Sequence, residues 1–386
     1  MKKFIEKLRN NMMLPFLAFI FAFFIGGIII VLSDAVVMSQ ISSPGKFLTS
    51  AAAKIGNSYL AVFQGSIFDI NLSRQSGIIN GFYPLSETIV TSTPLILSGL
   101  SVALAFRSGL FNIGAQGQFI FGAIGASYVG FHYNFSPVLH VTIAIFVGIL
   151  LGGLVGLLKA KTGAHEVIVT IMLNYVASLF ILWLLKTSTF LRPGRQDPLA
   201  PEVNPSAQLP KLFGENLRIH AGIFIALIAA VFVWWILNKS TLGFKFRAVG
   251  SNANAARTAG ISIPFVTTMT MFICGGLAGL GGAVHLLGTE HALAAGIAGS
   301  LGFDAITVAL LGQATPIGTV FGAFLFGALQ TGSRTLLSNT GTSPDIVQVI
   351  QALIVLFIAA PALMKSIFRI KKSLTDKSMT AKGWNG

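Results

Sequence analysis

The chain has 386 residues, of which 54% are hydrophobic and only 10% are charged, whereas soluble domains usually carry about 25% charged residues. So much apolar sequence, arranged in long blocks, excludes a water-soluble globular protein and predicts an all-α polytopic membrane protein. The formal net charge of +14 does not indicate a nucleic-acid partner, because the 26 lysines and arginines fall between the apolar blocks instead of forming one basic face.

About ten transmembrane helices are expected, some of them short or broken. The first apolar block, 13–32, follows a basic N-terminal segment and is interpreted as an uncleaved span. The others cover about 85–106, 115–131, 137–158, 167–185, 220–237, 264–287, 299–312, 316–333 and 345–364. The block 299–312 is too short to cross a core of about 30 Å as a plain helix, so we expect it to be tilted, broken or re-entrant.

The distribution of basic residues predicts that both termini are cytoplasmic, because this orientation places most lysines and arginines in short inside loops. The whole chain, 1–386, is then one transmembrane domain. Its predicted parts are a cytoplasmic N-terminus (1–12), two external segments (33–84 and 187–219), a cytoplasmic loop (238–263) and a cytoplasmic tail (365–386). Five prolines make the second external segment an extended loop, which is either a connector or a docking surface.

Glycines at spacings of four indicate close helix packing. Gly148, Gly152 and Gly156 share one helix face, as do Gly275 and Gly279. Small residues in this pattern let the backbones of neighbouring membrane helices approach closely.

A polar stripe runs along the predicted helix that follows Gly163. Glu166, Thr170 and Asn174 are four residues apart, so they lie on one face of a helix that is otherwise apolar. Such a stripe either forms interhelical hydrogen bonds or lines a polar cavity. We favour the cavity for Asn174, and we expect Glu166 to pair with Lys161 or another loop cation. His165-Glu166 is no zinc motif, because Val169 stands where the second histidine would be.

Two further places combine polar side chains with interrupted helix. Asn112 and Gln116 lie among Gly109, Gly114 and Gly117, a composition that disfavours regular helix and frees backbone groups. Such backbone is tolerated at membrane depth where it faces protein or a water-filled cavity, so these residues line a pathway or cap a broken helix. Asp304 in the short block is a site candidate for the same reason.

The inside loop from residue 238 contains a predicted short helix within 250–261. Ser251 or Asn252 is its candidate N-cap, an alanine-rich interior follows, and Gly260 ends it. A rigid helix outside the bilayer suits insertion into a partner's groove. The chain has no Gly-x4-Gly-Lys-Ser/Thr phosphate loop and no interpretable Ser-His-Asp constellation. It is therefore not expected to be an enzyme, and any ATP would be hydrolysed by another subunit.

Three segments together resemble a known family. Phe246-Arg-Ala-Val-Gly-Ser-Asn-Ala-Asn-Ala-Ala-Arg-Thr-Ala-Gly-Ile261 is similar to the cytoplasmic signature of permease subunits of ABC importers in the branched-chain amino acid and simple-sugar permease superfamily. Gly109-Leu-Phe-Asn-Ile-Gly-Ala-Gln-Gly117 and Glu166-Val-Ile-Val-Thr-Ile-Met-Leu-Asn-Tyr-Val176 resemble its nucleoside and simple-sugar branch. The resemblance covers roughly residues 85–370.

The resemblance implies a nucleoside importer in a bacterial cytoplasmic membrane. Its implied partners are a cytoplasmic ABC ATPase that carries ATP and Mg, a second permease chain (a paralogue or a copy of itself), an external binding lipoprotein or periplasmic protein, and membrane lipid. It further implies a substrate pathway and an ATPase-coupling helix. The expected pathway residues are Asn112, Gln116, Thr170, Asn174 and Asp304, and the expected coupling residues are Gly250, Ser251, Asn252, Ala255, Ala256, Arg257 and Gly260.

Two alternatives remain at the level of the sequence. A simple-sugar permease would have the same architecture. An ion-coupled secondary transporter, in which Glu166 or Asp304 binds the proton or sodium ion, belongs to a different class of transporter.

Overall fold

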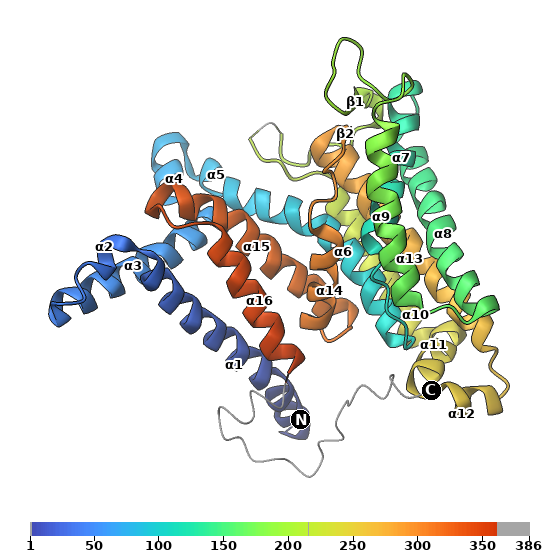
Figure 1. Cartoon of the computed structure of the whole chain (residues 1–386), viewed down its shortest axis with the longest axis horizontal. Helices are drawn as coiled ribbons and strands as arrows, with labels where there is room; N and C mark the ends of the chain where they lie inside the picture. Colours follow the sequence, from blue (N-terminus) through green and yellow to red (C-terminus); the bar gives the residue numbers. More distant parts are fainter. Residues whose placement is uncertain (1, 215, 361–386) are drawn as a thin grey trace. The chain divides into compact units, whose positions relative to one another are not determined.

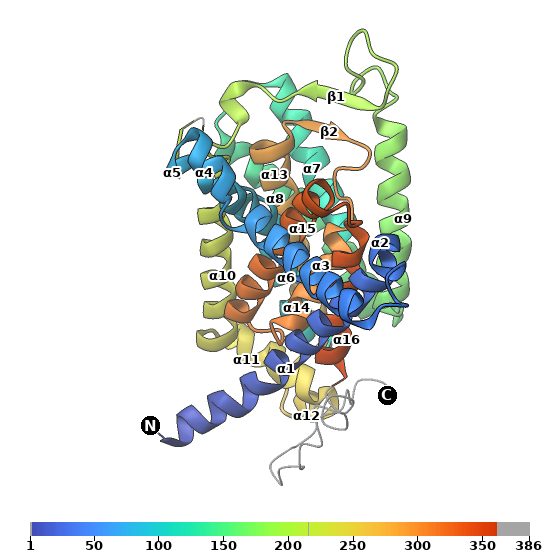
Figure 2. The same ribbon diagram turned by 90° about the vertical axis from the view of Figure 1, so that its left-hand side faces the viewer.

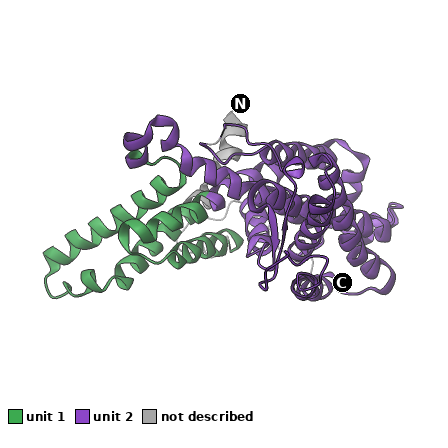
Figure 3. Ribbon diagram, turned by 90° about the horizontal axis from the view of Figure 1, so that it is seen from above, with its two compact units in different colours: residues 1–70, 328–386 green, residues 71–327 purple. Residues whose placement is uncertain are grey.

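The computed structural model describes residues 2–214 and 216–360, and the side chains from residue 17 onward. The predicted tail 365–386 lies outside these residues. The chain divides into two compact units, residues 1–70 with 328–386 and residues 71–327 (Figure 3). Each unit is described by itself.

The second unit is a bundle of membrane-length helices. Proline in the first turn begins three of its helices, where the missing N–H costs no hydrogen bond. The bundle helices are α6 (Tyr83–Arg107), α7 (Ala115–His132), α8 (Pro137–Thr162), α9 (Glu166–Leu184), α10 (Gly222–Lys239), α13 (Ile263–His285), the short α14 (Leu301–Leu311) and the beginning of α15 (Pro316–Thr340). Two short helices, α4 (Ile70–Ser76) and α5 (Ile78–Gly81), precede them.

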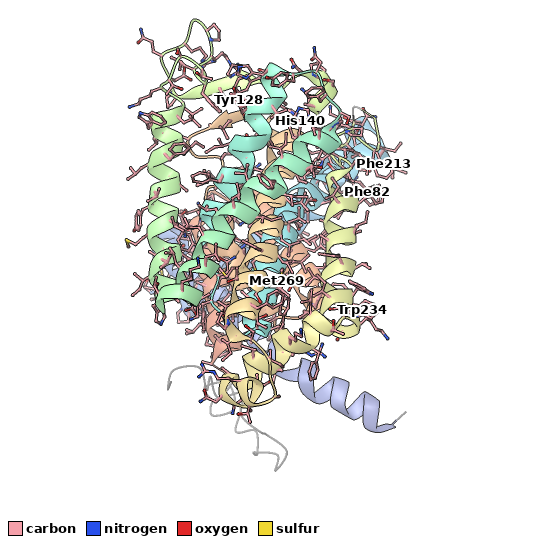
Figure 4. All side chains as sticks on the ribbon, turned by 90° about the vertical axis from the view of Figure 1, so that its right-hand side faces the viewer. Phe82, Tyr128, His140, Phe213, Trp234 and Met269 are labelled. Carbon is pink, nitrogen blue, oxygen red and sulfur yellow. The ribbon has the colours of Figure 1, made fainter. Side chains whose placement is uncertain are left out.

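The two ends of this bundle carry different structure (Figures 1 and 2). At one end, the strands β1 (Leu199–Glu202) and β2 (Ala292–Ala294) pair antiparallel, next to the turns η1 (Pro205–Ala207) and η2 (Leu286–Glu290, a π-helical turn). At the other end lie α11 (Thr241–Ser251) and α12 (Ala253–Thr258). Figure 4 shows Tyr128 near the β1 end and Trp234 toward the α11 end, as expected of aromatic residues at membrane interfaces.

Helix α13 packs against α6, α7 and α8, and its contact with α8 depends on glycine. A Cβ at Gly275 would overlap the carbonyl of Gly148, and a Cβ at Gly148 would overlap the carbonyl of Gly275. Gly152 meets the backbone of Gly275 in the same way. The predicted glycine packing is confirmed, because these backbones approach too closely for any side chain between them.

Gly275→Ala is expected to destabilise the protein, because overpacking costs about 1–3 kcal/mol. The measurement is thermal unfolding of detergent-purified protein. Gly56→Ala in α3 is the matched control, since a Cβ there meets nothing within 4 Å and alanine favours helix by about 1 kcal/mol. Equal unfolding temperatures for the two variants would contradict the packing argument.

The first unit contains α1 (Lys2–Ser33), α2 (Ala35–Met38), α3 (Pro44–Ser66), the end of α15 and α16 (Asp345–Ala359). Asp34 accepts hydrogen bonds from the N–H groups of Val36 and Val37 at the start of α2. The same carboxylate pairs with Lys54 of α3 at 2.6 Å, and Lys54 also donates to the Thr340 carbonyl at 2.7 Å. These contacts join α2, α3 and the end of α15.

Each of the ten predicted apolar blocks coincides with a helix of the described chain. By length and composition, α6, α8, α9, α10 and the segment Ile263–Glu290 can each cross a membrane. The expectation that the short block is no plain spanning helix is confirmed, because α14 has 11 residues and at 1.5 Å per residue reaches only about half of the hydrocarbon core. The extended loop at 187–219 is also confirmed, since its described residues form only β1 and η1. The number of membrane crossings and the sides of the termini stay predictions.

Candidate functional site

Helices α6 and α7 are joined by an irregular segment, residues 108–114, which we call the α6–α7 break. Gly109 within it has φ +72°, a left-handed conformation that glycine adopts without strain. A residue of the break itself, Asn112, holds it in place. The Asn112 amide donates to Ser101 Oγ at 2.9 Å and to Gln118 Oε1 at 2.8 Å, and Gln118 donates back to Asn112 Oδ1 at 3.1 Å. Asn112 is 1% exposed, so it fixes the break to both flanking helices.

Asn174 of α9 holds the other side of the same break. Its Oδ1 accepts the Gly117 N–H at 2.9 Å, and its Nδ2 donates to the Ile113 carbonyl at 2.9 Å. Gly117 lies in the first turn of α7, where backbone N–H groups have no partner within the helix. Asn174 therefore caps α7 from a neighbouring helix. This is interhelical hydrogen bonding, whereas the sequence favoured a cavity for Asn174.

The rest of the polar stripe on α9 also faces inward. Thr170 is fully buried and donates to the Glu166 carbonyl at 2.7 Å. A Cβ at Gly114 would lie 3.0 Å from the Thr170 Cβ, which is a tight contact. The buried Glu166 carboxylate pairs with Lys159. The partner is thus another cation and not Lys161. Asn174 lies eight residues after Glu166, so the two are about 12 Å apart along α9 at 1.5 Å per residue.

Gln116 connects the break to α14. Its Nε2 donates to the Gly299 carbonyl at 2.8 Å, and its Oε1 accepts the Gly302 N–H at 2.8 Å. Asp304 lies in the first turn of α14, where a carboxylate is favoured by the helix dipole, and accepts the Ser300 hydroxyl at 2.6 Å. The structure therefore gathers Asn112, Gln116, Thr170 and Asn174 around the break, and places Asp304 on the adjoining helix.

The helix predicted within 250–261 is confirmed as α12 (Ala253–Thr258). Asn252 is its N-cap, accepting the Ala255 N–H at 3.0 Å, and Gly260 follows its end with φ +79°. Ser251 is the last residue of α11 and donates to the Arg247 carbonyl at 2.8 Å, so of the two N-cap candidates only Asn252 has this role. Ala255 and Arg257 are exposed and available to a partner.

Two of the expected coupling residues face their own chain. Ala256 is 4% exposed, so its side chain supports α12 from within. Gly250 lies in α11, where a Cβ would overlap the Arg107 carbonyl and lie 2.9 Å from the Gly109 nitrogen. Sequence reasoning missed α11. Its signal was Ser240, whose hydroxyl accepts the Gly243 N–H at 3.0 Å as the N-cap.

The β1 end contains a histidine that sequence reasoning also missed. His220 is 2% exposed, and its Nδ1 accepts the Gly222 N–H at 3.1 Å. Burial, the neighbouring His285 and His291 and then Arg218 lower the pKa of His220 to about 4. It is therefore neutral at pH 7 and serves to close the turn before α10. Nearby, Arg218 pairs with Glu87 at 3.2 Å, joining this turn to α6.

Comparisons with known proteins identify the family to which the chain belongs. The family described as branched-chain amino acid transport system / permease component matches residues 85–359. The guanosine ABC transporter permease protein NupP of Bacillus subtilis is 40% identical over 77% of this chain and 87% of its own length. The nucleoside ABC transporter permease protein NupB of Lactococcus lactis is 34% identical over 77% of this chain and 85% of its own. The glucose ABC transporter permease protein TsgB13 of Haloferax volcanii is 32% identical over 78% and 80%, respectively.

No solved structure matches the chain. The family match includes every candidate pathway residue, the α6–α7 break, α11 and α12. The chain is therefore a multi-pass membrane protein that belongs to the permease component family of branched-chain amino acid transport systems.

Proposed function

We propose that this chain is the transmembrane permease subunit of an ATP-driven importer of nucleosides. The observation that carries the proposal is the pairing of an exposed, capped helix, α12, with a direct backbone contact from α11 to the α6–α7 break. A transport subunit driven by a separate ATPase needs such a pair: α12 binds the ATPase, and α11 contacts the polar site in the bundle. Two of the relatives, at 40% and 34% identity, are a guanosine and a nucleoside permease, which supports nucleoside as the cargo.

In the proposed assembly, an ABC ATPase binds on the cytoplasmic side and a substrate-binding protein binds on the external side. A separate ABC ATPase with ATP and Mg binds the exposed face of α12, since the chain itself has no phosphate loop. A second permease chain completes the pathway, and an external binding lipoprotein or periplasmic protein docks at the β1–β2 end. In the proposed topology, α12 and both termini are on the cytoplasmic side of a bacterial membrane.

The polar residues around the break set the proposed cargo path. Gln116, Asn112 and Asn174 are hydrogen-bonded within the protein in this conformation, so they hold the bundle closed at this depth. A change of access then requires these amides to exchange their partners within the protein for cargo or water. Nucleosides suit such groups, because their hydroxyls and base edges are donors and acceptors that amides can match.

Uptake by cells tests the cargo. Cells that lack the gene should regain uptake of labelled guanosine and uridine when the gene is restored, and should gain no ribose uptake. A glucose permease among the relatives makes a sugar importer the second candidate. Restored ribose or glucose uptake without nucleoside uptake would overturn the nucleoside assignment in its favour.

A further inference from the structure

Helix α14 is attached near both ends to residues that flank the α6–α7 break. At its N-terminal end, Gln116 takes the Gly299 carbonyl and the Gly302 N–H, each at 2.8 Å. At its C-terminal end, Arg107, the last residue of α6, donates from Nε to the Ala314 carbonyl at 2.8 Å and from Nη2 to the Gln313 carbonyl at 3.4 Å. The short helix is thus held near its two ends by Gln116 and Arg107.

The C-terminal attachment is at a strained turn. Gln313 and Ala314 have φ of +52° and +50°, a left-handed conformation that side chains with a Cβ disfavour. Two successive residues of this kind persist only where the surroundings fix them. The fork of the Arg107 guanidinium donates to both carbonyls, which a single ammonium group does less well.

The same arginine lies on the contact with the cytoplasmic helices. A Cβ at Gly250 would overlap the Arg107 carbonyl, and a Cβ at Gly109 would lie 3.0 Å from the Gly250 Cα. Asn252, the N-cap of α12, is two residues after Gly250. Since backbone meets backbone here, a displacement of α12 and the end of α11 presses directly on the end of α6.

We infer that Arg107 is a positioning residue for transport, which links the motion of α12 to α14 through the strained turn at Gln313 and Ala314. The inference rests on the proposed function and deepens it. When the ATPase moves α12, the end of α6 shifts. The Arg107 guanidinium then moves the turn at Gln313 and Ala314, and α14 moves with that turn. Asp304, in the first turn of α14, moves with the helix.

The test compares transport with ATP hydrolysis in the complete importer, reconstituted in liposomes with its ATPase, second permease and binding protein. Arg107→Lys keeps the charge but loses the fork. It should retain ATP hydrolysis stimulated by the binding protein, while guanosine transported per ATP falls about tenfold, within the range of about 5–150-fold that allosteric couplings span. Ala314→Gly in the Arg107→Lys background relieves the strain and should restore part of the ratio. Arg74→Lys in α4 makes the same exchange on an exposed residue outside this contact and should match wild type.

Two results would overturn the inference. One is a wild-type transport ratio in Arg107→Lys. The other is a proportional fall of hydrolysis and uptake, which indicates a merely structural role.

A second readout does not depend on the cargo. Spin labels at Phe303→Cys on α14 and Thr162→Cys at the end of α8 report a distance change when ATP and vanadate trap the ATPase. Cys274 is fully buried and free, so it stays unlabelled. The change should be present with Arg107 and lost with lysine. If wild type shows the change but carries no guanosine, the cargo assignment fails and the inference stands. If the change persists with lysine, the inference fails.

Discussion

Arg257→Asp is expected to abolish nucleoside uptake while the permease still inserts into the membrane. Arg257 is exposed on α12, and its basic side chain lies in the last turn of the helix, where a cation is favoured. An aspartate there reverses the charge presented to the ATPase and opposes the helix dipole. The measurement is guanosine uptake, together with co-purification of the ATPase and the amount of permease in the membrane.

The matched control is Lys161→Asp, which makes the same change of charge near the end of α8, on an exposed residue outside α12. We expect this variant to transport at nearly the wild-type rate. Normal uptake and normal ATPase binding by the Arg257→Asp protein would show that α12 is not the coupling helix.

Asn174→Leu is expected to lower both stability and transport. The change leaves the Gly117 N–H and the Ile113 carbonyl without their side-chain partner, and a buried polar group left unpaired costs about 1–3 kcal/mol. The midpoint temperature of thermal unfolding of the detergent-purified protein should fall by several degrees, since a loss of about 1 kcal/mol lowers it by roughly 2–4 °C in proteins of 150–250 residues. Uptake should fall as the α6–α7 break loses its position.

A graded series separates this effect from general damage to α9. Asn174→Gln keeps both an acceptor for the Gly117 N–H and a donor for the Ile113 carbonyl on a longer side chain, so it should lie between leucine and wild type. Tyr175→Leu changes a neighbour that is 65% exposed and should behave as wild type. Wild-type stability in Asn174→Leu would show that the cap on α7 carries little free energy.

The apolar blocks and the breaks between them could be predicted from the sequence, because membrane helices must be long and apolar and glycine-rich polar segments disfavour helix. The N-cap of α12 could be narrowed to Ser251 or Asn252, because both residue types are preferred at that position. In contrast, α3 escaped prediction. It mixes Lys54, Asn57 and other polar residues with apolar ones, so hydropathy did not set it apart from a loop.

The hydrogen-bond partners of the site could not be predicted. The spacing on α9 placed Asn174 on an inward face, yet it could not show that both ends of its amide would meet the backbone of the α6–α7 break. Contacts such as Arg107 with Gln313 and Ala314 join residues about two hundred positions apart. They follow from tertiary packing, for which a single sequence holds no local signal.

The central claim is that ATP hydrolysed by a partner drives nucleoside transport through this chain. The most direct test is uptake of labelled guanosine into liposomes that contain the complete importer, with ATP supplied to the ATPase side and no ion gradient. The account predicts uptake that requires ATP and continues when protonophore and sodium ionophore are present. Uptake driven by a proton or sodium gradient without ATP would contradict it and indicate an ion-coupled carrier.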